Sequence, residues 1–368
     1  MDSVNILDSK FEVTTDFEEA LQYVNYFMES YEVKIDDNFI NSKISITLNE
    51  GVVPETLNGT EVKVHTTKHD YWNFFGEYEI VDNIRRVLWP TKKIMVLLDE
   101  CANNIEIRYK SKDSPNLIGE VLFHIMRSLA LYKRENKGTN FLHASSVVLE
   151  GKGIAFTGAA SAGKTTLFLE SIFQLHAIPL SNDRIYIKNN SKEAIAYSWP
   201  SYASFCEGTL LNYSTLAAGA LDYQKNERNK YRTLNWESPL VSSFDKGNKR
   251  IYPMLWLSEC IEKKYLNSNK LDYIFLSKLD PQCTEDIVEV LSYEKDYPYI
   301  LDQVQSQLFD NNEPSFEQWH GISFNNNANT PEQFISNLKS NDCKFIKLHI
   351  NPTRLYVLTD YLNTIKRS

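Results

Sequence analysis

The first third of the chain alternates apolar and polar positions, which is the pattern of β-strands with one buried face. The alternating runs cover residues 43–48, 61–65, 77–81, 94–98 and 105–109. Residues 17–31 break the alternation, because Leu21, Val24 and Phe27 recur at helical spacing. The pattern therefore predicts a small α+β domain over residues 1–112, with one helix and a mainly antiparallel sheet.

Apolar positions recur at helical spacing again in residues 113–135, and we expect this helix to bridge two domains. The polar residues 136–140 form a junction, after which the pattern changes. Residues 141–187 contain an apolar strand, a glycine-rich turn, a helix and further strands, which is the order of a βαβ unit. We therefore predict an α/β domain over residues 136–368 and an α/β fold class.

Two polar stretches, residues 223–250 and 310–330, show little periodicity and are predicted to be loops. A loop as long as the first is often functional inside a compact domain, so a lid is one interpretation of it. The apolar runs 273–276 and 345–350 are predicted to be buried strands of the second domain.

Composition and charge narrow the classes of function. The chain has 368 residues, 42% of them hydrophobic, and a net charge of -9, which argues against binding to nucleic acid or to an anionic membrane. Its acidic N-terminus is unlike a signal peptide, and no apolar run is long enough to span a membrane, so we expect a cytoplasmic protein. The five cysteines form no CxxC pair, which argues against structural disulfides and a cysteine zinc site.

One motif indicates a specific chemistry. Residues 158–165, GAASAGKT, match the phosphate-binding pattern GxxxxGK[ST] between an apolar strand and a helical stripe. Glycine lets successive N–H groups turn around a phosphate, Lys164 adds a mobile positive charge, and the Thr165 hydroxyl can bind Mg²⁺. We predict an ATP and Mg²⁺ site; the alternative is a strand-to-helix turn without a ligand. The residues expected to hold the nucleotide are Gly158, Ala159, Ala160, Ser161, Ala162, Gly163, Lys164, Thr165 and Thr166.

Two further residues are candidates for the same site. A Mg²⁺-nucleotide site needs a carboxylate at a strand end, and Asp183 follows the apolar residues Ile178 and Leu180 soon after the motif. An Asn-Asp pair is otherwise typical of a turn. His143 stands at the start of the strand that precedes the motif, where a lone histidine is more often a core or edge residue than a catalyst.

Residues 142–184, LHASSVVLEGKGIAFTGAASAGKTTLFLESIFQLHAIPLSNDR, resemble the core of the HPr kinase/phosphorylase-like proteins. These are P-loop kinases related in fold to phosphoenolpyruvate carboxykinase, with a histidine-containing strand, a hairpin, a P-loop, a helix and an Asp-Asp pair. The resemblance implies that Lys164 and Thr165 hold phosphates and metal. It also implies that Asp183 binds Mg²⁺ or helps proton transfer, and that His143 lies near the transferred phosphate. The implied catalytic residues are therefore Asp183, His143 and Lys164.

The sequence departs from the family at Asn182, where the first aspartate of the pair usually stands. An amide cannot accept a proton as a carboxylate does. Either Asp183 serves as the base, or another residue does, or catalysis has been lost. If the carboxylate pair matters, Asn182→Asp is expected to preserve or raise activity.

Three later residues are weaker candidates for substrate contacts. Glu207 could contact substrate or metal, although a solvated acid is the more common role. Lys249 and Arg250 could neutralise charge that develops on the phosphate in the transition state, or form an ordinary basic pair on a loop.

The function that these motifs favour is Mg²⁺-dependent transfer of the ATP γ-phosphoryl group to a hydroxyl, on a peptide or protein serine or on a small molecule. The resemblance extends to tailoring kinases of peptide natural products, including those that phosphorylate lasso-peptide tails. The alternatives are a nucleotide-binding regulatory or scaffold protein without phosphoryl transfer, and an NTP hydrolase. We expect the N-terminal domain to recognise the acceptor. The sequence leaves open the acceptor, the donor (ATP, GTP or pyrophosphate) and the oligomeric state, and is compatible with a homo-oligomer.

Overall fold

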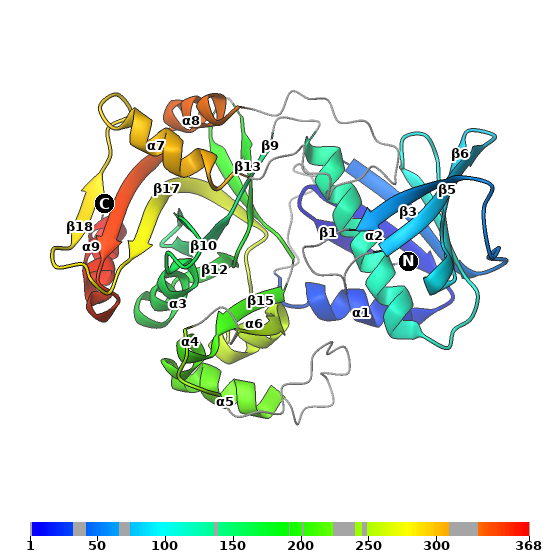
Figure 1. Ribbon diagram of the computed structural model, residues 1–368, viewed down its shortest axis with the longest axis horizontal. Helices are drawn as coiled ribbons and strands as arrows, with labels where there is room; N and C mark the ends of the chain where they lie inside the picture. The colour runs from blue at the N-terminus through cyan, green and yellow to red at the C-terminus, as the bar shows by residue number, and fades with distance from the viewer. Residues whose placement is uncertain are drawn as a thin grey trace. The chain divides into compact units, whose positions relative to one another are not determined.

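The computed structural model describes residues 2–31, 42–65, 74–135, 139–190, 192–200, 202–223, 240–244, 249–308 and 330–367. The chain divides into two compact units (Figure 1). The first unit comprises Met1–Met28, Val33–Lys137 and Asp310–Ala328, and the second comprises Glu29–Glu32, Gly138–Phe309 and Asn329–Ser368. Most of the loops predicted at 223–250 and 310–330, and part of the junction 136–140, lie outside the described residues.

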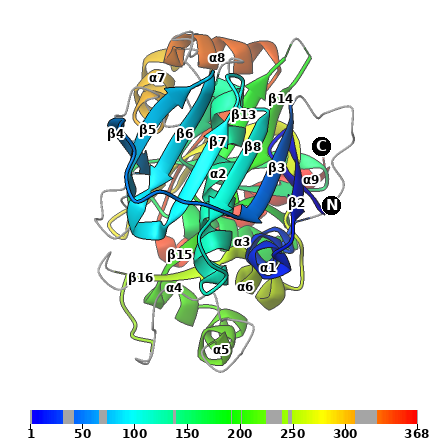
Figure 2. The same ribbon diagram turned by 90° about the vertical axis from the view of Figure 1, so that its right-hand side faces the viewer.

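The first unit is built on an eight-stranded sheet, ordered β1-β2-β3-β8-β7-β6-β5-β4, and Figure 2 shows the strands β2 to β8 side by side. β3 pairs in parallel with β2 and with β8, and the other neighbours are antiparallel. The elements are β1 (Asp2–Ile6), β2 (Ser9–Thr15), α1 (Glu18–Met28), β3 (Ser42–Glu50), β4 (Thr60–His65), β5 (Phe74–Val81), β6 (Ile84–Trp89), the 3₁₀ turn Pro90–Lys92, β7 (Ile94–Leu98), β8 (Asn104–Tyr109) and α2 (Pro115–Glu135).

The helix expected to bridge two domains is α2, and it belongs to the first unit, where it packs on α1. A Cβ on Gly119 would lie 2.4 Å from Cβ of Tyr23 and 2.6 Å from the carbonyl oxygen of Ala20. The rings of Phe27 and Phe123 stack with centroids 4.9 Å apart. The close approach of the two helices therefore depends on the missing side chain at Gly119.

The second unit is built on a nine-stranded sheet, ordered β12-β10-β11-β17-β14-β13-β9, with β19 beside β17 and β18 beside β19. Only β11, β17 and β19 pair in parallel among the described strands of this sheet. The strands are β9 (Thr139–Leu142), β10 (Ala144–Leu149), β11 (Lys152–Thr157), β12 (Ile178–Ser181), β13 (Ile185–Asn189), β14 (Ala194–Ser198), β17 (Ser268–Leu279), β18 (Ile287–Val290) and β19 (Lys344–Ile350). The molecule is thus a mixed α/β protein.

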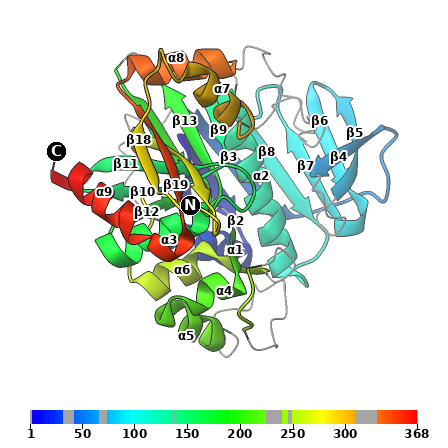
Figure 3. The ribbon, with the colours of Figure 1, turned by 60° about the vertical axis from the view of Figure 1, so that its left-hand side comes forward.

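The predicted βαβ unit has an extra strand inside it. The helix α3 (Lys164–Leu175) connects β11 to β12, but β10 lies between these strands and pairs antiparallel with both (Figure 3). β11 and β12 therefore run in the same direction without being neighbours. The parallel neighbour of β11 is β17, far along the chain.

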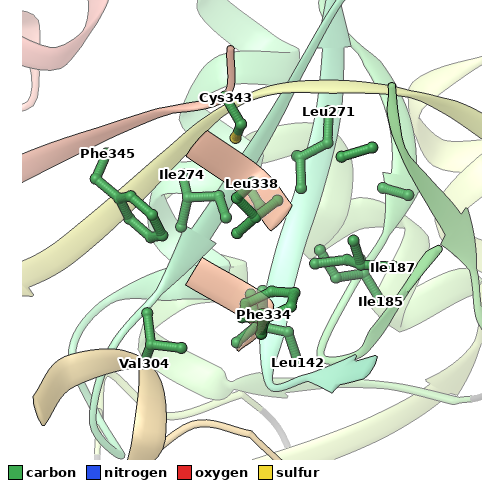
Figure 4. Close-up of a cluster of buried hydrophobic side chains, with 14 of the residues drawn as sticks. Leu142, Ile185, Ile187, Leu271, Ile274, Val304, Phe334, Leu338, Cys343 and Phe345 are labelled. Atoms are coloured by element: carbon green, nitrogen blue, oxygen red, sulfur yellow. The ribbon is translucent and has the colours of Figure 1, made fainter. Parts of the chain in front are cut away.

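Helices cover both faces of this sheet. Ala155, Ile274 and Phe345 belong to a buried cluster with α7 (Tyr297–Gln305) and α8 (Pro331–Ser340), part of which Figure 4 shows. The alternate residue Phe275 points the other way, because successive strand side chains face opposite sides, and its ring lies 6.0 Å from that of Tyr361. Tyr361 is in α9 (Tyr356–Arg367), which follows the 3₁₀ turn Pro352–Arg354 and contacts α3.

Between β14 and β17 the chain leaves the large sheet and forms a smaller assembly. Its described elements are the two-stranded sheet of β15 (Tyr202–Cys206) and β16 (Lys249–Pro253), with α4 (Glu207–Leu211), α5 (Ser214–Tyr223) and α6 (Met254–Ile261). Its centre is aromatic, with Tyr252 and Trp256 stacked at 4.0 Å between ring centroids.

We expect Gly119→Ala to destabilise the first unit. The effect should exceed the intrinsic preference for alanine, which stabilises a helix interior by about 1 kcal/mol relative to glycine. The added Cβ would overlap Tyr23, and overpacking of this kind costs about 1–3 kcal/mol plus the displacement of α1. Thermal unfolding followed by circular dichroism should show a lower midpoint. Ser128→Ala in the same helix, at a half-exposed position, is the control and should leave the midpoint nearly unchanged. A higher midpoint for Gly119→Ala would contradict the close packing of α1 and α2.

Candidate nucleotide-binding site

The pairing of three strands brings distant residues to one edge of the second unit's sheet. In the register of β10, Ala144 faces Thr157, the last residue of β11, and Ser146 faces Ser181, the last residue of β12. β11 and β12 therefore end where β10 begins. His143, the loop 158–163 and Asp183 follow directly from these strand ends, so the structure brings together the candidates on which the predicted site depends.

His143 lies at a break in the strand predicted over residues 141–149. The run is two strands, because β9 pairs with β13 whereas β10 pairs with β11 and β12. The backbone N–H of His143 donates to the carbonyl of Gln307 at 2.9 Å, and its own carbonyl accepts from Thr157 Oγ1 at 2.9 Å. The break fixes the backbone at His143 and leaves its imidazole one-third exposed.

The loop after β11 is shaped by two glycines and braced by β17. Gly158 and Gly163 have φ of +152° and +88°, and Ser161 also has a positive φ. A Cβ on Gly158 would lie 2.4 Å from the carbonyl oxygen of Ser277, and one on Gly163 would lie 2.3 Å from the side chain of Leu279. The N–H of Leu279 donates to the carbonyl of Ala162 at 3.1 Å. The loop therefore needs both glycines to fit against the end of β17.

Lys164, the first residue of α3, folds back over this loop. Its Nζ donates to the carbonyl oxygens of Gly158 at 2.7 Å and Ala159 at 3.1 Å, and the residue is 9% exposed. Desolvation lowers the pKa of Lys164 to about 8; the charge of Asp183 opposes this shift and that of Lys249 adds to it. A charged phosphate oxygen is a stronger hydrogen-bond partner for an ammonium group than a neutral carbonyl oxygen. A bound phosphate can therefore replace the two carbonyl oxygens as the partner of the Lys164 ammonium.

Asp183 occupies a left-handed backbone conformation, with φ of +102°, which few residues other than glycine adopt. Its Oδ1 lies 3.2 Å from His143 Nε2, and its Oδ2 lies 3.4 Å from Arg184 Nε. Desolvation acts to raise the pKa of Asp183, but the hydrogen bond with His143 and the charges of Arg184, His143 and Lys164 outweigh it and lower the pKa below its usual value. Asp183 is therefore ionised at neutral pH, and strain of this kind is often found at functional positions.

The residues present suit a Mg²⁺ ion that arrives with a nucleotide. The ranges that the structure describes contain no group of three His, Cys, Asp or Glu residues able to hold a metal on their own. Mg²⁺ in nucleotide sites is usually held by one or two carboxylates, with phosphates and water as the other ligands. The ionised Asp183 and the half-buried hydroxyl residue Thr165 at the start of α3 match this requirement.

Asn182 is not open to a substrate. Its residue is 1% exposed, and its Oδ1 accepts a hydrogen bond from Ser145 Oγ at 3.1 Å. Asn182 is therefore a buried amide that ties the turn after β12 to β10.

Glu207 and Arg250 form a buried ion pair, with Glu207 Oε1 2.7 Å from Arg250 Nε and side chains that are 9% and 2% exposed. Glu207 Oε2 also accepts from the N–H of Val241 at 2.7 Å. Glu207 is thus not a solvated acid, and Arg250 lies on β16 rather than on a loop. The two charges neutralise each other, because neither would be stable alone in this position.

Lys249 differs from its neighbour Arg250. It is exposed at the start of β16, opposite Cys206, and its positive charge is close enough to Lys164 to lower the pKa of that residue. The structure therefore brings one of the three weaker candidates toward the loop, as a cation whose charge a phosphate could neutralise.

Several residues that shape the site carry no signal in the sequence. Ser277 and Leu279 brace the loop from more than a hundred residues away, and Ser145 holds Asn182 through a contact that only the pairing of β10 with β12 reveals. Arg184 is the exception, because it directly follows Asp183 in the sequence and its Nε lies 3.4 Å from Asp183 Oδ2.

No family model and no curated protein matches the chain. Among solved structures, the chain matches the Hpr(Ser) kinase/phosphatase from Coxiella burnetii at 14% sequence identity and a TM-score of 0.26, over 62% of this chain and 95% of that one. At this TM-score the match bears neither on the fold nor on the reaction of this chain. No helix of the described residues is long and apolar enough to cross a membrane.

The lowered pKa of Lys164 predicts pH-dependent binding of ATP. The free protein loses the Lys164 proton as the pH rises through about 8, whereas a bound phosphate would favour the charged form. ATP affinity measured by calorimetry should therefore fall about tenfold from pH 7.5 to 9.5. Lys164→Met should bind about tenfold more weakly or worse at pH 7.5 and lose this pH dependence. Lys192→Met, at an exposed turn, is the control; equal affinity in wild type and Lys164→Met would contradict the site.

The burial of Asn182 changes the expectation for Asn182→Asp. Burial raises the pKa of a carboxyl group, because the charged form is poorly solvated. The resulting loss of folding stability is complete at neutral pH, where the group is charged, and disappears as the pH falls toward the usual pKa of aspartate. We expect the free energy of unfolding to fall by about 1–3 kcal/mol at pH 7.5, and by less at pH 5. Asn212→Asp, at an exposed position, should change it little at either pH. Unchanged stability of Asn182→Asp at pH 7.5 would mean that the side chain reaches solvent.

Proposed function

We propose that this protein is a kinase that transfers the γ-phosphoryl group of ATP to a hydroxyl. The observation that supports this most is the pair of His143 and Asp183, 3.2 Å apart, at the strand edge from which the loop carrying Lys164 begins. A phosphate-binding loop alone would suit any nucleotide protein. An oriented, ionised carboxylate beside it adds the group that a hydroxyl acceptor requires.

Each residue has a role that its environment supports. The N–H groups of residues 158–165 and the ammonium of Lys164 would hold the β- and γ-phosphates. Mg²⁺, held by Thr165 and Asp183, would supply charge neutralisation on the phosphate oxygens. His143 would donate from Nε2 to Asp183 Oδ1 and so orient the carboxylate.

Asp183 Oδ2, which His143 does not contact and which lies 3.4 Å from Arg184 Nε, would take the proton of the acceptor hydroxyl. Its lowered pKa makes it a weak base. A weak base is sufficient for phosphoryl transfer, because in its loose transition state the acceptor hydroxyl loses little of its proton before the phosphoryl group is transferred. Lys249 and Arg184 would neutralise charge that develops on the transferred group.

A second candidate is a nucleotide-binding regulatory protein that has lost phosphoryl transfer. The observation that favours it is the buried Asn182, which leaves Asp183 as the one carboxylate of the pair. An NTP hydrolase is the third candidate, since the same loop would bind ATP with water as the acceptor.

The acceptor that we propose is a peptide or protein serine, or a small molecule with a hydroxyl, and the first unit is the module that we propose to recognise it. This assignment is by elimination, because every nucleotide-site candidate lies in the second unit. A tailoring kinase of a peptide natural product is one version of this proposal.

Incubation with γ-labelled ATP, Mg²⁺ and candidate peptides or cell extract separates the three functions. Label in an acceptor supports the kinase. Release of phosphate without a labelled acceptor supports the hydrolase, and binding without turnover supports the regulatory protein.

We expect Asp183→Asn to abolish phosphoryl transfer while keeping the fold, because asparagine tolerates the left-handed backbone that Asp183 adopts. Turnover should fall about a hundredfold or more, with ATP affinity in the absence of Mg²⁺ changed by less than about twofold. Asp360→Asn, an exposed carboxylate on α9, is the matched control and should keep full activity. Full turnover by Asp183→Asn would show that another residue serves as the base.

A further inference from the structure

A short segment from the first half of the sequence is built into the second unit. The N–H of Tyr265 donates to the carbonyl of Ser30 at 2.8 Å, and Tyr31 forms a parallel β-bridge with Tyr265. The rings of the two tyrosines lie 5.6 Å apart. Ser30, Tyr31 and Tyr265 are 0%, 3% and 0% exposed, so the segment is part of this unit's core and not a linker that passes over it.

Tyr265 connects this segment to β12, the strand that ends just before Asp183. The N–H of the next residue, Leu266, donates to the carbonyl of Pro179 in β12 at 3.0 Å. Lys263 Nζ donates to the carbonyl of His176, just before β12, at 2.6 Å. The turn 263–266 therefore holds the start of β12.

Tyr31 also reaches the end of β12 by a second route. Its hydroxyl lies 3.5 Å from the carbonyl oxygen of Trp199, a long contact, and the N–H of Trp199 donates to Ser181 Oγ at 3.3 Å. Ser181 Oγ in turn donates to the carbonyl of Arg184 at 2.5 Å and closes the turn 181–184. Asp183 lies inside this turn.

We infer that Tyr31 is a positioning residue for Asp183: its contacts with Tyr265 and Trp199 hold both ends of β12 and so keep Asp183, in the turn 181–184, in its left-handed conformation. A strained backbone conformation persists only where the surrounding structure over-determines it. The role of Asp183 in phosphoryl transfer rests on the proposed function, whereas the order of the turn does not. The nucleotide site therefore depends on a residue that precedes it by more than a hundred positions.

The test uses the full chain with Tyr31→Ala, Tyr31→Phe and Tyr23→Ala. Tyr23 is the matched control, because it is equally buried, at 4% exposure, but belongs to the first unit. Hydrogen exchange over residues 178–187 should become about tenfold faster in Tyr31→Ala and stay unchanged in Tyr23→Ala. Tyr31→Phe should accelerate this exchange less than Tyr31→Ala, since it keeps the ring against Tyr265 and loses only the long hydroxyl contact with Trp199.

Nucleotide binding supplies the second readout. In Tyr31→Ala, the gain in ATP affinity on adding Mg²⁺ and kcat should each fall about tenfold, with affinity in the absence of Mg²⁺ within about twofold of wild type. If Tyr31→Ala does not fold, Tyr31→Leu keeps the apolar volume and is measured in the same way.

Unchanged exchange over residues 178–187 in Tyr31→Ala, or in Tyr31→Leu where that variant replaces it, would overturn the inference, as would an equal change in Tyr23→Ala. A wild-type chain that binds Mg²⁺-ATP without transferring phosphate would instead overturn the proposed kinase. In that case the exchange and metal-dependence measurements would still decide the role of Tyr31.

Discussion

The pairing of β10 with both β11 and β12 determines the site. Because β10 runs against its two neighbours, the ends of β11 and β12 meet its beginning, and His143, the loop 158–163 and Asp183 come from three strand ends at one edge. These three groups are brought together by the pairing of adjacent strands and not by a distant loop. The backbone hydrogen bonds of a central sheet therefore position these groups, which is the rigid support that the proposed site needs.

The electrostatics of this edge prepare it for an anion. Lys164 is nearly buried against two carbonyl oxygens and has a lowered pKa, whereas Asp183 keeps its charge through His143 and Arg184. The charged form of Lys164 is disfavoured by its burial, so a bound phosphate would stabilise it, whereas the protein itself stabilises the charge of Asp183. Glu207 and Arg250 are the contrasting case, since they satisfy each other and form part of the scaffold that places Lys249.

The sequence predicts those features of the structure that depend only on neighbouring residues. The loop 158–165 follows from its own glycines and lysine, and the alternating runs correspond to β3, β4, β5, β7 and β8. β6 was missed because its sequence, IRRVLW, lacks alternation. The split of one predicted strand at His143, the burial of Asn182 and the Glu207–Arg250 pair depend on which strands become neighbours. Such long-range pairing leaves no trace in a single sequence, and Tyr31 could not have been assigned to the second unit for the same reason.

The most direct test of the account is a crystal structure of the full chain with Mg²⁺ and a non-hydrolysable ATP analogue, in which the position of Lys164 Nζ is measured. We expect Nζ to leave the carbonyl oxygens of Gly158 and Ala159 and to contact the β- and γ-phosphates, and Asp183 would help to hold the metal. Phosphates bound elsewhere, with Nζ still on the two carbonyls, would contradict it.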